Sequence, residues 1–394
     1  MTVLVLVDRP SAAAFAPLAT ARPLATIRVG ARLVHERWAL AFGRPVHGIV
    51  ARPALAGFAE PGQPALLDDD EVVPAGTIVA WSDFAPAIDA RATHDAQAWC
   101  ADGAFVAMRL AEARPAHALR DADTLLAAGD ASAHEIAGWT VRHPWDVIGD
   151  LPATLAADAA VLAATMPVTP LPPHVVVLGT YPVRIAASAS VEPFTVLDAR
   201  AGAIVIEDDA TVKSHSRLVG PFVVCATGQW LGGAGHTCVI GPHAKAHGEM
   251  STTILAGHAN KGHDGFVGHS YLAPWSNFGA GTITSNLKNT YGRVQFAGAA
   301  TGLQFLGSLV GDHAKTGIGT RLTTGTRVGV GANVVGDGIA GPDLAPFAWG
   351  TGGARTELTK FIETAIRVMA RRQVVPSDAH LAMLMRLHHE LSTG

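Results

Sequence analysis

The sequence is poor in cysteine, in charged residues and in long apolar runs. Its three cysteines, Cys100, Cys225 and Cys238, form no CxxC pair, so we expect free thiols in a cytoplasmic protein. Charged residues make up 16% of the 394 residues and the net charge is −4, so no basic surface for nucleic acid is expected. No segment approaches the roughly 18 consecutive apolar residues of a membrane-spanning helix, so we expect no membrane insertion.

The residues that are abundant indicate a compact protein with a large core. Hydrophobic residues reach 49%, which argues against disorder, and the 42 glycines suit a fold with many tight turns. The chain begins MTVLVLVDRP, with no basic segment before the apolar run. We therefore expect a buried strand there and not a signal peptide.

Residues 1–165 have the pattern of an α/β domain. Val3–Val7, Val46–Ala51 and Thr77–Trp81 are expected strands, and Leu33–Phe42 is an expected helix. Because strands alternate with helix, the pattern favours a parallel sheet. The Pro-rich stretch 166–174 is the expected linker.

From 175 to 345, aliphatic and aromatic residues recur at every sixth position. The runs are Ile185, Val191 and Leu197; Ile206, Val212, Leu218 and Val224; Phe266, Leu272 and Phe278; and Leu322, Val328 and Val334. This period is typical of hexapeptide repeats, in which triangular coils stack aliphatic side chains inward. We predict a parallel β-helix, with a Gly-rich β-sandwich as the alternative.

Two segments interrupt the period, and the last part of the chain follows another pattern. The interruptions are Cys225–Val239 and Leu287–Phe305, and insertions in repeat folds usually leave as loops on one face. Residues 354–392 show helical spacing, with Ser377 as the expected N-cap of a second helix. We expect these helices to cap the β-helix, with packing on a neighbouring subunit as the alternative.

Residues 254–291 lie between the two interruptions and hold His258, His263 and His269 within twelve residues. Histidine suits removal of a proton from an amine, although each could instead be a structural residue of the coil wall. The spacing of His258 and His263 is similar to that of the zinc ligands of β-helical carbonic anhydrases, with His236 or His243 as a third ligand. No third histidine has a clear spacing, and a site at Cys225, Cys238 and His236 is weaker still, so we predict no metal site.

Several motifs in this region resemble one family. Lys261-Gly262-His263 is followed, fourteen residues after the histidine, by Asn277-Phe278-Gly279-Ala280-Gly281-Thr282-Ile283-Thr284-Ser285-Asn286, and Gly248-Glu249-Met250 lies upstream. These segments resemble the acyltransferase half of the bifunctional bacterial enzyme that acetylates glucosamine-1-phosphate and then uridylylates it. Residues 17–38, 254–291 and 311–320 are closer still to a branch of sugar nucleotidyltransferases related to that enzyme.

The resemblance implies a left-handed β-helix, a homotrimer with sites between subunits, and acetyl transfer from acetyl-CoA to an amino sugar phosphate. His263 is the first choice of base, because it keeps the family spacing to Asn277, and His269 is the second. The expected substrate-binding residues are Asn277, Asn286, Lys245, Lys261, Lys288 and Arg293. The expected contacts of acetyl-CoA are Ala280, Gly281, Ser308 and Lys315. Asparagines at coil corners, glycines at hexad corners and solvated lysines are the structural alternatives.

The sequence also departs from the family. Ser251, Phe266 and Leu287 replace a lysine and two tyrosines, so the acceptor could differ from glucosamine-1-phosphate. The strand Val3–Val7 leads into DRPSAAAFAPLATARP, which lacks the Gly-rich loop that wraps nucleotide phosphates. The residues left there to hold phosphate or Mg²⁺ are Asp8, Arg9, Arg22 and Arg28.

The sequence thus predicts a nucleotidyltransferase-like α/β domain at 1–165, an acyltransferase-like left-handed β-helix at 175–345 and a helical cap at 354–392. The expected activity is N-acetylation of an amino sugar phosphate, coupled to nucleotide-sugar formation from UTP or dTTP if the first domain is active. The alternatives are a sugar-1-phosphate nucleotidyltransferase with a structural β-helix, a γ-type zinc hydrolyase, and a non-catalytic trimeric scaffold.

Overall fold

The computed structural model describes residues 3–93, 95–121, 133–336 and 338–392. Contacts divide the chain into two compact units, Met1–His143 with Val375–Leu387, and Pro144–Val374 with His388–Gly394. The helix α4 (Leu151–Thr165) lies in the range expected for the first domain, but it groups with the second unit, where it contacts β-helix strands. Each unit is described by itself.

The first unit is built on a six-stranded sheet with the order β11-β8-β9-β6-β1-β4. Its strands are β1 (Leu4–Val7), β4 (Gly48–Val50), β6 (Ile78–Trp81), β8 (Ala98–Ala101), β9 (Ala104–Arg109) and β11 (Ala133–Glu135). The expected strands are confirmed, and β1 is parallel to β4 and β6. The sheet is mixed and not parallel throughout, because Asp102 (φ 51°) and Gly103 (φ 75°) form a two-residue turn that folds β9 back antiparallel to β8.

The expected helix is α1 (Val34–Phe42), which ends at Gly43 in the left-handed conformation (φ 61°). Three small antiparallel pairs flank the sheet: β2 (Arg28–Val29) with β3 (Arg32–Leu33), β5 (Val72–Val73) with β10 (Arg114–Pro115), and β7 (Phe84–Pro86) with β12 (Gly138–Thr140). Short 3-10 helices span Pro10–Phe15, Leu24–Thr26, Pro53–Leu55 and Ala116–Arg120.

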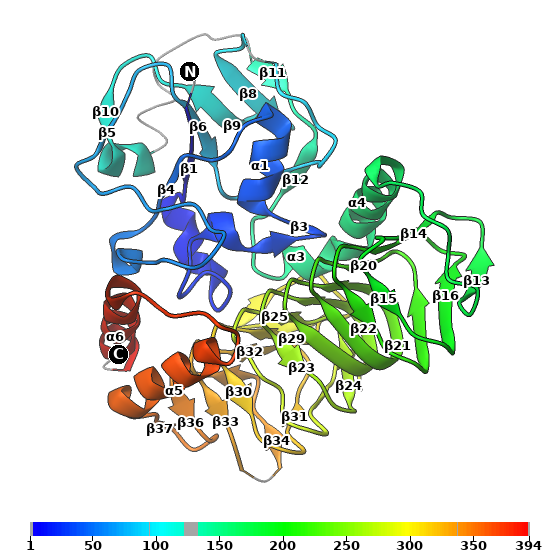
Figure 1. The fold of residues 1–394 in the computed structure, drawn as a ribbon. Helices are drawn as coiled ribbons and strands as arrows, with labels where there is room; N and C mark the ends of the chain where they lie inside the picture. Colours follow the sequence, from blue (N-terminus) through cyan, green and yellow to red (C-terminus); the bar gives the residue numbers. More distant parts are fainter. Residues whose placement is uncertain (1–2, 94, 122–132, 337, 393–394) are drawn as a thin grey trace. The chain divides into compact units, whose positions relative to one another are not determined.

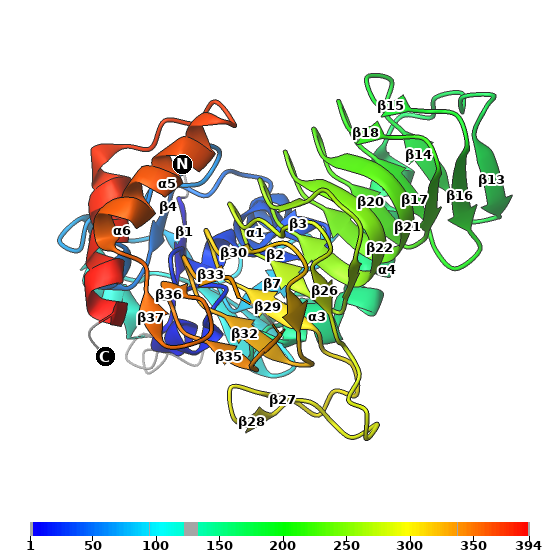
Figure 2. The same cartoon turned by 90° about the horizontal axis from the view of Figure 1, so that it is seen from below.

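The second unit is a left-handed parallel β-helix, which confirms the fold predicted from the six-residue period. Figures 1 and 2 show its coils stacked in sequence order after α3 (Asp146–Gly149) and α4. The first face holds β14 (Val183–Ile185), β17 (Ile204–Ile206), β20 (Phe222–Val224), the ends of β21 (Gln229–Ile240) and β22 (Lys245–Leu255), β25 (Tyr271–Leu272), β29 (Ser308–Val310), β32 (Thr326–Val328) and β35 (Asp343–Leu344).

Two further faces complete each coil. The second face holds β15 (Ser190–Val191), β18 (Thr211–Val212), the starts of β21 and β22, β23 (Asn260–Lys261), β30 (Lys315–Thr316), β33 (Asn333–Val334) and β36 (Ala348–Trp349), which pairs with β37 (Ala354–Arg355). The third face holds β13 (Val176–Gly179), β16 (Thr195–Ala199), β19 (Ser216–Val219), the middles of β21 and β22, β24 (Phe266–Gly268), β26 (Ile283–Thr284), β31 (Arg321–Leu322) and β34 (Ile339–Ala340).

The residues of the six-residue period form the core of the β-helix, with one exception. Leu197, Val212, Leu218, Val224 and the other periodic residues are buried together in one cluster. Phe266 is only half-buried, and its neighbour Val267 points inward instead. Adjacent strand residues face opposite sides, so a shift of one position turns Phe266 away from the core.

One corner of the coils carries a column of stacked rings in the left-handed conformation. His243, His258, Trp275, His313 and Phe347 have φ values of 58°, 65°, 64°, 59° and 56°. Ring centroids are 4.9 Å apart for His243 and His258, 4.1 Å for His258 and Trp275, and 6.2 Å for Trp275 and His313. His243 and His258, two of the histidines that stand out in the sequence, are therefore structural members of this column.

The two interruptions of the period differ in structure. Cys225–Val239 does not leave the coil as expected. Two of its glycines, Gly232 (φ 124°) and Gly233 (φ 99°), turn the chain within β21. A Cβ on Gly233 would lie 2.3 Å from the carbonyl oxygen of Gly248, so the coil requires glycine there. Leu287–Phe305 does leave the coil, as the arm with the hairpin β27 (Gln295–Phe296) and β28 (Ala299–Ala300) in Figure 2.

Both predicted C-terminal helices are present. α5 (Leu358–Ala370) buries Phe361, whose ring meets that of Phe347 edge-on at 4.9 Å, so α5 packs on the last coil. α6 (Asp378–Ser392) begins after Ser377, whose Oγ accepts a hydrogen bond of 3.2 Å from the backbone N–H of His380. None of the helices in the described part of the chain is both long and apolar enough to cross a membrane.

Candidate functional site

His263 is exposed at the turn between the second and third faces of the β-helix. Lys261 lies beneath it with 1% of its surface exposed, and its Nζ donates hydrogen bonds to the carbonyl oxygens of His247 (3.0 Å) and His263. Burial lowers the pKa of Lys261 to about 8. Lys261 therefore fixes the turn that presents His263, and it does not reach solvent as the predicted substrate ligand would.

His269 and Asn286 form a second polar pair, at the opposite edge of the third face. The Asn286 Nδ2 donates to His269 Nδ1 at 2.8 Å, and the imidazole stacks on Phe305 with centroids 5.2 Å apart. Burial lowers the pKa of His269 to about 4, with a smaller effect from His236, so the ring is neutral near pH 7. Since Nδ1 accepts this bond, the ring hydrogen sits on Nε2, which can donate but cannot accept a proton.

The positions of the two histidines separate their roles. His263 precedes the strand β24 and His269 follows it, so the two side chains lie at different corners of the same coil. An extended strand advances about 3.3 Å per residue. The strand between the two histidines therefore holds their imidazoles too far apart for both to contact one amine of the same substrate molecule directly. Of the two predicted bases, His263 is exposed to solvent, whereas His269 is half-buried and bonded to Asn286.

The low pKa of His269 predicts a pH effect on stability. The folded-state pKa of about 4 lies below the ordinary 6.5, so the unfolded chain binds a proton that the folded chain does not between these values. Stability is therefore lost as pH falls through this window and is unaffected above it. We expect His269→Gln to lose less unfolding free energy than the wild type between about pH 7.5 and about pH 5. Urea unfolding at both pH values measures this, and equal losses in the two proteins would contradict the assignment.

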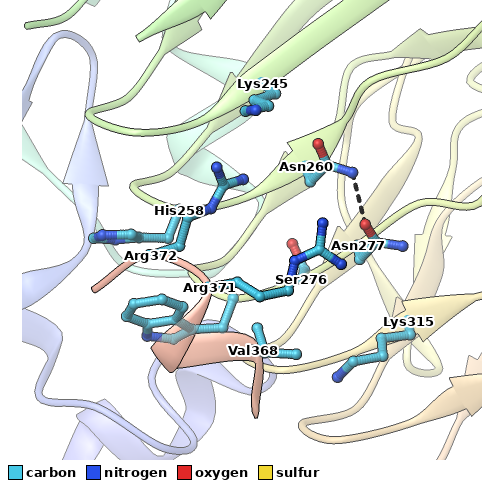
Figure 3. Close-up of a pocket in the computed structure, with 10 residues that line it drawn as sticks. Lys245, His258, Asn260, Ser276, Asn277, Lys315, Val368, Arg371 and Arg372 are labelled. Carbon is cyan, nitrogen blue, oxygen red and sulfur yellow. Dashed lines mark hydrogen bonds between the residues drawn. The ribbon is translucent and has the colours of Figure 1, made fainter. Parts of the chain in front are cut away.

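A polar row crosses four successive coils on the second face. Lys245 pairs with Asn260, Asn260 with Asn277, and Asn277 with Lys315, so their side chains share one register. The Asn260 Nδ2 donates to Asn277 Oδ1 at 2.6 Å. The row forms one wall of a pocket of about 420 Å³, shown in Figure 3, and the end of α5 forms another wall.

This pocket includes residues that the sequence did not single out. Arg371 and Arg372 follow α5, and they line the pocket with Lys245, Asn277 and Lys315. The only signal for them was two adjacent arginines after a helical pattern, which is common on surfaces. Lys315 was predicted to contact acetyl-CoA; its Nζ donates to the carbonyl oxygen of His313 at 2.7 Å, and burial lowers its pKa to about 8.

The remaining acetyl-CoA contacts predicted from the sequence fall in different surroundings. Ala280 and Gly281 lie at a turn, where Gly281 is exposed with φ 71°. A Cβ on Gly279 would lie 2.6 Å from the carbonyl oxygen of Gly317, so coil stacking alone explains that glycine. Ser308 is fully buried, and its backbone N–H donates to Ser270 Oγ at 2.9 Å, so it cannot meet the CoA chain as expected.

Lys288 and Arg293 lie apart from the polar row, on the arm that leaves the coil. Lys288 is half-buried and Arg293 is exposed. The structure therefore does not gather all the predicted substrate-binding cations into one place. The second-face pocket contains Lys245, while these two residues stay on the arm.

No metal centre is formed by the histidines and cysteines considered above. In the part of the chain that the structure describes, no group of three His, Cys, Asp or Glu side chains is placed to hold a metal ion. His258 stacks on Trp275, and the Sγ of Cys238 donates to the carbonyl oxygen of His236 at 3.2 Å.

In the first unit, the residues predicted to hold a nucleotide lie in the segment that follows β1, and ligands of open α/β sheets bind beyond the carboxyl ends of the strands. Asp8 is buried, and its carboxylate accepts hydrogen bonds from the backbone N–H groups of Leu24 (2.9 Å) and Ala25 (3.4 Å). Burial raises the pKa of Asp8 to about 6, although the hydrogen bonds from Ser82 and from these two backbone groups act to lower it.

The three arginines of this group are engaged within the unit. Arg9 bonds Asp83 through Nε at 2.9 Å, and Arg22 binds both oxygens of Glu60 at 3.0 and 2.9 Å. Arg28 is buried and donates to the carbonyl oxygen of Ala31. The Arg9 guanidinium places a positive charge against Asp83, and backbone N–H groups hold Asp8. This arrangement does not fit a bound Mg²⁺, and we derive no step through that ion.

Comparison with known proteins finds a family model that is similar to the first part of the chain. Residues 4–166 match the model described as sugar nucleotidyl transferase. This confirms the resemblance drawn from residues 17–38, although the matched segment lacks the Gly-rich loop.

The chain is also similar to curated proteins with bifunctional names. It is 30% identical over 226 residues to a Clavibacter sepedonicus protein named "Bifunctional protein GlmU", covering 55% of this chain. It is 28% identical over 155 residues, or 36% of this chain, to a Sulfurisphaera tokodaii "Bifunctional sugar-1-phosphate nucleotidylyltransferase/acetyltransferase". The match spans 38% of the length of each relative.

The chain is also similar to solved structures, of which one is described as follows. A Bacillus cereus protein described as an acetyltransferase matches at 12% identity, over 56% of this chain and 98% of its own, with a TM-score of 0.21. A likeness this low supports no conclusion about function.

Proposed function

We propose that the β-helix transfers an acetyl group from acetyl-CoA to the amino group of an amino sugar phosphate. The observation that carries the proposal is His263, an exposed imidazole on a turn fixed by the buried Lys261. An amine must lose a proton before it can attack a thioester, and a positioned imidazole performs this task near neutral pH. The bifunctional names of the two relatives support the same assignment.

In the proposed reaction, the amine nitrogen attacks the thioester carbonyl while His263 takes its proton. The C–N bond forms, the C–S bond breaks, and the CoA thiolate leaves and is protonated. Glucosamine-1-phosphate is the first acceptor to test, although Ser251, Phe266 and Leu287 argue that the acceptor contacts differ from the family pattern. Thiol release from acetyl-CoA on adding the amino sugar tests the proposal, and a full panel of amino sugars without release would end it.

The site is proposed to be completed by a neighbouring subunit in a homotrimer. His263 is exposed in the single chain, whereas acyl transfer needs a site that holds substrate and excludes water. Light scattering should then give a particle mass three times 40.7 kDa. A monomer that is nonetheless active in acetyl transfer would contradict this part of the proposal.

A second activity, sugar-1-phosphate nucleotidyl transfer, is favoured by the family match of residues 4–166. In that reaction the sugar phosphate attacks the α-phosphate of UTP or dTTP and releases pyrophosphate, giving a nucleotide sugar. Coupled detection of pyrophosphate with a panel of sugar-1-phosphates tests it. If neither UTP nor dTTP releases pyrophosphate with any sugar-1-phosphate, the first unit does not have this activity.

A further inference from the structure

The second-face pocket concentrates positive charge. Its lining includes Lys245, Lys315, Arg371 and Arg372 and contains no aspartate or glutamate. Across the ranges that the structure describes, none of these four side chains is within salt-bridge distance of a carboxylate. Figure 3 shows Lys245 and Lys315 on the β-helix side of the pocket and Arg371 and Arg372 on the side of α5.

The cations come from two strands of the β-helix and from the segment after α5, which are far apart in the sequence. Lys245 and Lys315 stand at the two ends of the polar row, about 14 Å apart if three strand spacings of about 4.8 Å separate them. Arg371 and Arg372 come from the end of α5. The C-terminal end of a helix carries a partial negative charge, which stabilises the nearby arginines. This charge does not balance the two lysines, which lie on the β-helix.

The mutual repulsion of these cations affects their ionisation. The pKa of Lys245 is lowered first by burial and then by Arg372 and Arg371. The pKa of Arg372 is lowered by burial and by Arg371. Clustering like charges in a partly buried pocket is unfavourable unless an anion is bound among them.

The other lining groups suit a small molecule that carries such an anion. Asn260 and Asn277 offer amide groups between the lysines, and the bond between them leaves the Asn277 amide nitrogen unused. Trp275 and the stacked His258 supply a flat apolar wall. The volume of about 420 Å³ lies within the usual range for small-molecule pockets, about 300–1,000 Å³.

We propose that this pocket binds the phosphate group of a phosphorylated small molecule, held between the lysines of the β-helix and the arginines that follow α5. The proposal does not rest on acyl transfer, because it concerns binding alone. A sugar phosphate, a CoA ester and a nucleotide present the same phosphate chemistry, and they differ in the group attached to it.

Isothermal titration of the full chain with phosphorylated probes and their phosphate-free counterparts tests the proposal. The pairs are glucosamine-1-phosphate and glucosamine, CoA and pantetheine, and UTP and uridine. We expect at least one phosphorylated probe to bind saturably, its counterpart to bind much more weakly, and the affinity to fall as salt is added. The strongest pair identifies the source of the phosphate.

Variants locate the binding to this pocket. Removing one charge-assisted hydrogen bond should weaken binding about tenfold or more, so R371Q, R372Q and K245M should each raise the Kd for the phosphorylated probe. R367Q is the matched control, since Arg367 lies on the same helix, is exposed and pairs with Glu363 at 2.9 Å outside the pocket. Thermal melts of each variant verify folding. The proposal is overturned if no phosphorylated probe binds, or if the folded pocket variants bind like R367Q.

Discussion

His263→Ala should lower the turnover number for acetyl transfer by about 10²–10⁴-fold, the usual contribution of a general base. The KM for acetyl-CoA should change little, because a proton-transfer group acts mainly in the transition state. Steady-state thiol release at saturating acetyl-CoA measures both constants. Because His263 is exposed, we expect its removal to leave the fold intact, and thermal melts of the variant verify this.

His269→Ala is the comparison that gives this result its meaning. The Nδ1 of His269 accepts from Asn286 and its pKa is about 4, so it is not the base in this structure. We expect His269→Ala to keep most of the acetyl-transfer turnover that His263→Ala loses. The opposite pattern would assign the base to His269 and contradict our account of the two histidines.

Leu272→Ala should reduce the free energy of unfolding of the β-helix by about 2–5 kcal/mol, the range for a leucine removed from a packed core. Leu272 is fully buried in the column formed by the six-residue period. Urea unfolding followed by circular dichroism measures the change.

Phe266→Ala provides the control for this stability change. Phe266 belongs to the same series in the sequence, but it is half-buried, while Val267 takes the inward place. We therefore expect its removal to cost less than Leu272→Ala, by about 1 kcal/mol or more. A loss at Phe266 equal to that at Leu272 would show that the register of this coil is wrong.

The sequence predicts the β-helix well because each coil repeats the same physical requirement. One inward aliphatic residue per face and a tight corner suffice, and Val212, Leu218 and Leu272 follow this rule. The rule fails where the sequence can place either of two neighbours inward, as at Phe266 and Val267. The sequence pattern also does not reveal that two glycines keep Cys225–Val239 within the coil, because close backbone contacts between neighbouring coils leave no periodic signal in the sequence.

The candidate site was harder to predict, because its residues meet only in three dimensions. The sequence predicts Lys261 as a substrate-binding residue and His263 as the base, yet Lys261 is buried and supports the turn that carries His263. His258 was a possible zinc ligand, but its left-handed corner places it in a stack of rings. Arg371 and Arg372 reach the pocket only because α5 packs on the last coil, which a helical pattern cannot reveal.

The most direct test of the central claim is mass spectrometry of the product formed from acetyl-CoA and glucosamine-1-phosphate, extended to other amino sugar phosphates. The account predicts an acetylated sugar phosphate in step with free CoA, formed by the wild type and lost in His263→Ala. It is contradicted if no amino sugar phosphate is acetylated by the folded protein, or if His263→Ala forms the product at the rate of the wild type.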